Sequence, residues 1–178
     1  MTTATRIAEV EAADAFLDQP KTLDGAPPLW IGSNWGGELT ATWIILDEFE
    51  APVGELRFTA QTTDTSVTSL SLIAAGKSLW RMDFDHGSVC HSNPHDGYVQ
   101  GLPPMVCGAH EHAWPINRQH VLNQSLWTLP YRCALPTTVR RLGQGLHWLS
   151  DQINLTITPD QRGFEGPTRS DLFDRGGQ

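Results

Sequence analysis

A short run of alternating residues near the middle of the chain limits the fold most strongly. Over residues 78–85, large apolar side chains take every second position and charged side chains lie between them. The apolar residues are Trp80, Met82 and Phe84, and the charged residues are Arg81, Asp83 and Asp85. Successive side chains of a β-strand point to opposite faces, so the run predicts a strand with one apolar and one polar face.

Neighbouring segments predict the rest of a sheet. Residues 39–47, 54–60 and 67–75 are rich in apolar and β-branched residues, and residues 54–60 alternate in the same way. The connections between them are short, which favours antiparallel pairing of consecutive strands. With a further short strand at 109–114, we expect a mainly antiparallel sheet over residues 39–115.

Two amphipathic segments predict helices. Residues 3–18 carry an apolar stripe and end before Pro20, and residues 138–152 carry a second stripe that Thr137 or Thr138 could cap. The two glycines within the second segment, Gly143 and Gly145, would allow it to lie close to the sheet. The sequence therefore predicts an α+β fold: a mainly antiparallel sheet, a C-terminal helix packed on one face and a flanking N-terminal helix.

The length of 178 residues suits one domain. We assign residues 1–158 to this domain and expect a polar tail at 159–178, because that segment is rich in glycine and polar residues. Residues 19–37 and 86–108 are rich in turn-forming residues and are expected to be loops.

Charge and apolar content exclude several functions. The net charge is −8, and residues 31–80 alone carry six acidic and two basic residues, or −4. Without a basic patch the chain is a poor candidate for binding a nucleic-acid backbone. No apolar run approaches the ~20 residues of a membrane span, and residues 1–10 lack the apolar core of a signal peptide. We expect a cytoplasmic protein.

The three cysteines form no C-x-x-C pair. In a reducing compartment we expect them to be thiols or metal ligands and not disulfides.

Six of the seven histidines fall between His86 and His120, and the densest part is Cys107-Gly-Ala-His110-Glu-His112. On a strand, His110 and His112 would share one face with Cα atoms roughly 6.5–7 Å apart, and Glu111 would face the other side. This spacing lets two imidazoles bind one metal ion or flank one anion.

The cluster leaves three interpretations open. The first is a site for zinc or another divalent metal; the candidate ligands are His91, His110, His112, Cys90 and Cys107. The spacing matches no standard structural zinc module. The second interpretation is a metal-free site in which imidazoles act as general acid and base. The third is a hydrogen-bonded polar surface patch without chemistry.

Arg81 and Asp83 would lie on one strand face. They could form a plain ion pair, or Asp83 could orient a histidine while Arg81 binds an anion.

The motifs Arg81-Met-Asp83, His91-Ser-Asn93-Pro94 and Gly108-Ala-His110-Glu-His112 resemble those of an uncharacterised family of small bacterial proteins, over about residues 65–158. The resemblance implies an α+β domain and a shared polar site, but no activity. The site residues that it implies are Arg81, Asp83, His91, Asn93, His110 and His112. In this chain Cys90 and Cys107 lie beside the motifs, which leaves metal binding open.

We favour a hydrolase, metal-dependent or acid–base, that acts on an anionic, phosphoester-like substrate. His110, His112, Asp83 and Arg81 would carry the chemistry, and Arg81 and Asn93 would bind the substrate. The alternatives are a non-catalytic acidic protein that covers the basic surface of a protein partner, and a component of a toxin–antitoxin or phage-defence system. The sequence gives no oligomeric state.

Overall fold

The computed structural model describes residues 2–32 and 36–168, apart from the side chains of residues 98–100. The helices within these residues are α1 (Thr3–Asp18), α2 (Trp114–Asn123) and α3 (Leu142–Gln152), with a 3-10 helix, η1, at His95–Gln100. The strands are β1 (Lys21–Leu23), β2 (Ile31–Gly32), β3 (Glu38–Leu46), β4 (Pro52–Gln61), β5 (Thr68–Ala74), β6 (Lys77–Phe84), β7 (Cys90–Ser92), β8 (Met105–Cys107), β9 (His110–His112), β10 (Cys133–Ala134) and β11 (Leu155–Thr156).

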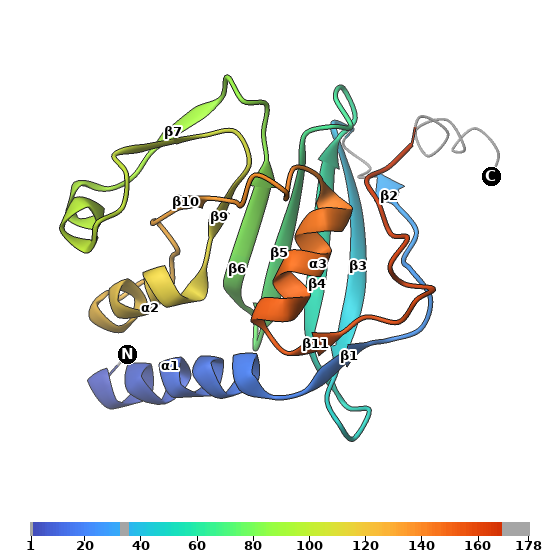
Figure 1. Cartoon of the computed structure of the whole chain (residues 1–178). Coiled ribbons are helices and arrows are strands. Elements are labelled where there is room, and N and C mark those ends of the chain that lie inside the picture. Colours follow the sequence, from blue (N-terminus) through green and yellow to red (C-terminus); the bar gives the residue numbers. More distant parts are fainter. Residues whose placement is uncertain (1, 33–35, 169–178) are drawn as a thin grey trace.

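One large sheet organises the described part of the chain. Its strands lie in the order β10-β9-β6-β5-β4-β3-β1-β11, with β2 paired to β3. The long strands β3 to β6 form the antiparallel meander that the alternation predicts, and β1 pairs with β11 in parallel. Figure 1 shows α3 across one face of this sheet and α1 along the end of its strands. The predicted α+β architecture is confirmed.

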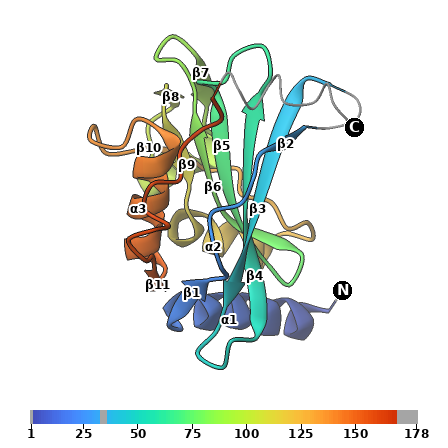
Figure 2. The ribbon, with the colours of Figure 1, turned by 90° about the vertical axis from the view of Figure 1, so that its right-hand side faces the viewer.

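The alternating residues of β6 divide as expected. Trp80, Met82 and Phe84 are buried, whereas Arg81 and Asp83 face the other side. The buried face continues through β5, β4 and β3, and α3 covers it. Figure 2 shows this layer of helix against sheet from the side. The opposite face of β6 therefore remains for polar groups.

Helix α1 has the predicted bounds because both ends are capped. The Thr2 hydroxyl accepts a hydrogen bond from the Thr5 backbone N–H at 3.2 Å. At the other end the buried Lys21 ammonium donates to the carbonyls of Phe16 at 2.6 Å and Leu17 at 3.1 Å. Burial lowers the pKa of Lys21 to about 8. Carbonyl groups at a helix C-terminus favour a cation there, which offsets part of the desolvation cost.

Helix α3 starts later than expected. Residues 137–141 form a turn, with the Val139 N–H donating to the Pro136 carbonyl at 2.8 Å. The N-cap is Arg141, which makes no side-chain cap bond, so the prediction that Thr137 or Thr138 caps the helix is wrong. The expected close approach to the sheet is confirmed at Gly145, which lies against the Phe84 ring.

The segments expected to be loops contain regular structure. Residues 19–37 contain β1 and β2, and residues 86–108 contain β7, η1 and β8. Strands β7 and β8 pair in a separate two-stranded sheet, and Figure 1 shows this arm reaching away from the main sheet. Helix α2 was not predicted either, although Pro115 at its first turn suits a helix start.

The C-terminal segment packs further than expected. Phe164 is buried, and its ring lies 4.6 Å from that of Phe58 and 5.5 Å from that of Trp43, between centroids. Gln161 is also buried and donates to the Leu23 and Gly25 carbonyls at 3.1 and 2.8 Å. Part of the segment at 159–168 thus packs on the core, while residues 169–178 lie outside the described residues. The division into a domain at 1–158 and a tail at 159–178 stays a prediction. In the described ranges no helix has the length and apolar character needed to cross a membrane.

Replacing Gly145 by alanine should destabilise the protein. A Cβ there would lie 2.3 Å from the Phe84 ring, which is buried and cannot move aside freely. We expect a loss of about 1–3 kcal/mol in unfolding free energy from overpacking, measured by urea denaturation.

Gly143→Ala is the matched control in the same helix. The three atoms nearest to its Cβ would all belong to the Glu165 carboxylate, the far end of a half-exposed side chain. Its stability should change little or rise. Equal effects of the two substitutions would contradict the close packing at Gly145.

Candidate functional site

The pairing of β6 with β9 places the motif residues side by side. In the antiparallel register Arg81 lies opposite His112 and Asp83 opposite His110. Directly opposed residues in a sheet point to the same face. The four side chains therefore gather on the sheet face opposite α3, as one patch on two strands.

A cavity of about 520 Å³ opens over this patch. Its lining combines the two strands, the β7–β8 arm and the segment after α2. The lining residues are Ser78, Arg81, Asp83, Asp85, His91, His110, His112, Trp127, Thr128, Leu129 and Arg132. His91 thus joins the β6–β9 residues, and its ring lies 4.9 Å from that of His110, between centroids. The structure brings five of the candidate residues to one cavity.

Backbone hydrogen bonds orient both strand histidines in the same way. His110 Nδ1 lies 2.8 Å from the Gly108 carbonyl oxygen, and His112 Nδ1 lies 2.6 Å from that of Leu129. A carbonyl only accepts, so each Nδ1 carries the proton. Each Nε2 then presents its lone pair, the arrangement in which an outer-shell acceptor prepares a histidine for metal binding.

The two Nε2 atoms lie close to one carboxylate. Asp83 Oδ2 is 3.6 Å from His110 Nε2 and 3.8 Å from His112 Nε2. The ligand atoms of these three residues lie within 4.8 Å of one another. Bonds of about 2.0–2.1 Å to a tetrahedral zinc ion put neighbouring ligands about 3.3 Å apart. The two distances to Asp83 are thus within about 0.5 Å of this value, and the group could hold such an ion if its ligand atoms moved closer together.

Asp85, His91 and His110 form a second group with the same spacing limit. His91 Nε2 lies 2.9 Å from Asp85 Oδ2, a hydrogen-bond distance. The His110 atom near Asp85 is Nδ1, at 4.0 Å, and this nitrogen already donates to Gly108. The second group is thus better suited to a carboxylate–imidazole proton pair than to a metal ion.

Arg81 and Asp83 form the ion pair that the sequence suggests. Arg81 Nε and Nη2 donate to the Asp83 carboxylate at 2.7–2.9 Å. These hydrogen bonds raise the pKa of Arg81 further. The Arg81 side chain nevertheless remains 53% exposed, so part of its guanidinium is open to the cavity.

Burial keeps His112 neutral. Its side chain is 12% exposed, and desolvation lowers its pKa to about 4, with a smaller lowering from the charge of Arg132. A neutral imidazole is the form that binds a metal ion.

Asn93 lies beside the cavity in a different role from the expected one. Its Nδ2 donates to the Pro103 and Arg132 carbonyls at 2.8 and 2.9 Å, and its Oδ1 accepts from the Arg132 N–H at 2.8 Å. The buried amide thus joins the β7–β8 arm to Arg132. Substrate binding by Asn93 stays a prediction that this geometry does not favour.

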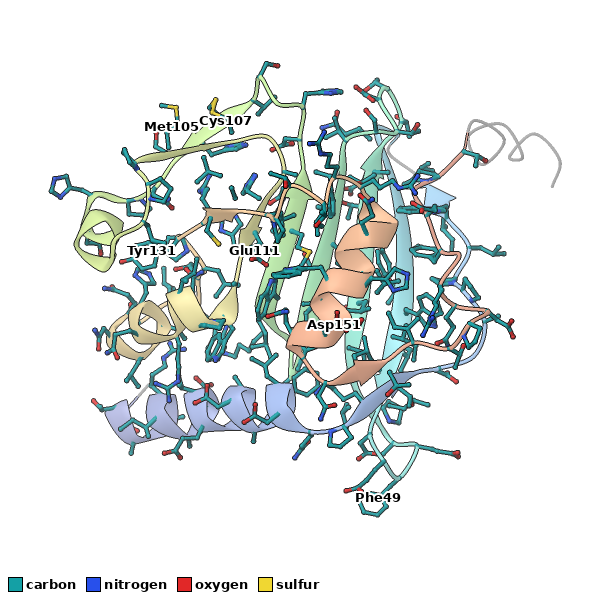
Figure 3. All side chains as sticks on the ribbon, viewed as in Figure 1. Phe49, Met105, Cys107, Glu111, Tyr131 and Asp151 are labelled. Carbon is teal, nitrogen blue, oxygen red and sulfur yellow. A yellow bond between two sulfur atoms is a disulfide. The ribbon has the colours of Figure 1, made fainter. Side chains whose placement is uncertain are left out.

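The expectation for two cysteines is wrong. Cys90 and Cys107 oppose each other in the β7–β8 pairing and form a disulfide; Figure 3 labels Cys107 on this arm. A bonded sulfur offers no thiolate to a metal ion. Cys133 is a free thiol whose pKa burial raises to about 11.

Glu111 lies on the other face of the sheet, as the alternation predicts. Figure 3 labels it near β9, and its carboxylate accepts from the Trp80 indole at 2.8 Å and the Trp148 indole at 3.3 Å. Burial raises the pKa of Glu111. It belongs to the layer between sheet and α3 and not to the cavity.

Arg132 is the cavity residue that sequence reasoning missed. It lies between two prolines in a segment without periodicity, and the only signal there was a weak basic bias.

Comparison of the chain with protein-family models, with curated proteins and with solved structures gives no significant match in any of the three. The resemblance to the small bacterial family therefore stays a prediction.

In metal-free protein, His112 should titrate near pH 4. The unfolded chain protonates this histidine near its ordinary pKa of 6.5, whereas the folded chain does so only near 4. Between these values the unfolded state binds the extra proton, so this group lowers stability as pH falls from 6.5 to 4 and has no effect above. NMR titration of the imidazole resonances and unfolding at pH 7 and 4.5 would measure both effects.

His112→Gln should remove this part of the pH dependence, and His86→Gln, at an exposed site beside Asp64, should not. A His112 resonance that titrates near 6.5 would contradict the expected burial effect.

Proposed function

We propose that Asp83, His110 and His112 bind a divalent cation, zinc by preference, and that the protein hydrolyses an anionic, phosphoester-like substrate in the cavity above them. The shared arrangement of the two histidines carries this proposal: each donates through Nδ1 to a backbone carbonyl, and each Nε2 lies within 3.8 Å of the same carboxylate oxygen. Nitrogen and oxygen donors of this kind suit zinc.

Three protein ligands would leave a fourth position for water or substrate, as in catalytic zinc sites. A zinc ion there would supply a water of lowered pKa at neutral pH. Asp85 would hold His91 beside the site, where the imidazole can accept or return a proton. Arg81 would bind negative charge of the substrate and orient the Asp83 carboxylate through its hydrogen bonds.

The metal-free alternative uses the same residues. His110 and His112 would then act as general acid and base, with Asp83 orienting one of them. The low pKa of His112 favours the metal-binding version, because a group with a pKa of about 4 is a weak base at neutral pH.

A second candidate function is a non-catalytic protein that covers the basic surface of a partner. The acidic balance of residues 31–80 supports it. Leu29, Ile31 and Phe49 are strongly exposed. Leu29 and Ile31 lie two residues apart, whereas Phe49 lies in the connection between β3 and β4, and exposed apolar residues in ones and twos are common. This function and a role in a toxin–antitoxin or phage-defence system stay predictions.

A cytoplasmic location also stays a prediction. The disulfide between Cys90 and Cys107 counts against it, since disulfides are rare in reducing compartments.

Metal-free protein should bind one zinc ion per chain. His112→Ala and Asp83→Asn should each weaken binding by more than the roughly 10–100-fold lost with an outer-shell partner, because each removes a direct ligand. Calorimetric titration measures the affinity. Zinc-dependent hydrolysis of a chromogenic phosphate ester, lost in the same variants, tests the reaction.

His86→Ala is the control, because His86 comes from the same histidine-rich stretch but binds Asp64 outside the cavity. It should keep zinc affinity and activity. Zinc-free protein whose hydrolysis is unaffected by His112→Ala would contradict the proposal.

A further inference from the structure

Three strands bring two arginines to either side of His112. Arg81 lies opposite His112 in the β6–β9 pairing. In the β9–β10 pairing Cys133 lies opposite Glu111 and Ala134 opposite His110. One residue further along, this antiparallel register places Arg132 next to His112. Arg81, His112 and Arg132 thus form one row across the sheet, and all three line the cavity.

The Arg132 side chain has a buried donor that the fold leaves unsatisfied. Its Nε is buried and has no hydrogen-bond partner. Within the described ranges its guanidinium forms no ion pair with an acidic group; its recorded hydrogen bonds come from the backbone N–H and C=O. A buried guanidinium nitrogen without a partner costs free energy, and a bound anion would remove that cost.

The fold fixes Arg132 firmly despite its missing partner. Asn93 bonds both backbone groups of Arg132 through one buried side chain. The same Asn93 amide bonds Pro103, in the arm that the Cys90–Cys107 disulfide closes. The main chain of Arg132 is thus fixed at the wall of the cavity, so its side chain starts from a defined position, which favours a preorganised binding group.

Both acidic residues that line the cavity, Asp83 and Asp85, already have hydrogen-bond partners. Asp83 accepts from Arg81, and Asp85 lies at hydrogen-bond distance from His91. Arg132 is therefore the guanidinium of the cavity lining that no carboxylate contacts in the described residues. The exposed part of Arg81 can contribute a second guanidinium edge from the opposite side of His112.

We propose that Arg132, with Arg81, forms a binding subsite for the phosphate group of a phosphate monoester beside His112. This inference rests on the proposed function and specifies which residues bind the charged group of the substrate. Strands β6 and β10 are two strand spacings apart, roughly 9.5–10 Å, a gap that two arginine side chains can span around one tetrahedral anion. A phosphate group presents several pairs of oxygens and can bind both planar guanidinium forks in bidentate fashion, whereas the two oxygens of a carboxylate form one such bidentate edge.

The test measures phosphate binding to metal-free, chelator-treated protein by NMR titration at constant ionic strength. One titration uses inorganic phosphate and a second uses phenyl phosphate, and a titration with chloride measures the effect of ionic screening. Arg132→Gln should weaken binding of both phosphates about tenfold or more. Arg132→Lys keeps the charge but loses the planar fork, so its phosphate affinity should lie between those of wild type and Arg132→Gln. This variant keeps the test valid if the glutamine variant misfolds.

Arg162→Gln is the matched control, because it removes the same charge from an exposed residue outside the cavity. It should leave both affinities unchanged. Equal affinities in wild type, Arg132→Gln and Arg162→Gln would overturn the subsite. Binding of inorganic phosphate without phenyl phosphate would overturn the assignment to a monoester.

The outcomes separate the subsite from the metal site. Zinc binding without phosphate binding would overturn the subsite and leave the metal site standing. Arg132-dependent phosphate binding by protein that never binds zinc would support the subsite and contradict the metal site.

Discussion

The register between β6 and β9 is the constraint on which both the core and the candidate site depend. It sets Met82 against Glu111 on the covered face and Asp83 against His110 on the open one. A slip of one residue would exchange the faces of β9, burying two imidazoles under α3 and exposing Glu111. The indoles of Trp80 and Trp148 oppose such a slip, because they donate to the Glu111 carboxylate only in this register. Packing on the covered face thus determines which side chains lie on the open face.

Alternation along the chain predicts the sheet and the shared face of His110 and His112, and apolar stripes at helical spacing predict both outer helices. Those features depend on local periodicity, which a sequence displays directly. The β7–β8 arm, its disulfide and the burial of Phe164 depend on contacts between distant segments, which spacing alone does not encode. Arg132 was missed for the same reason. Its place beside His112 follows from the β9–β10 register, and the segment between Pro130 and Pro136 has no periodicity that would predict a strand there.

The turn-rich segment 86–108 acts on the site mainly through the backbone. Its Gly108 carbonyl fixes the tautomer of His110, and its Asn93 amide fixes the main chain of Arg132. Among the described side chains of this segment, His91 is the one that lines the cavity. The disulfide joins the two strands that carry these contacts, so it restrains the geometry of the site without contributing a ligand to it.

Charge in the cavity links the cation site to the anion subsite. With neutral histidines, Arg81 and Arg132 balance Asp83 and Asp85, and the lining carries no formal net charge. A divalent cation on Asp83, His110 and His112 would make the same cavity doubly positive. A phosphate monoester carries up to two negative charges, so the two ligands would favour each other through the field that they share, and linkage requires this coupling to be equal in both directions. Neither ligand alone leaves the cavity neutral, whereas the cation and a dianion together do. A site built in this way binds the cation and the phosphate monoester together more tightly than it binds either ligand alone.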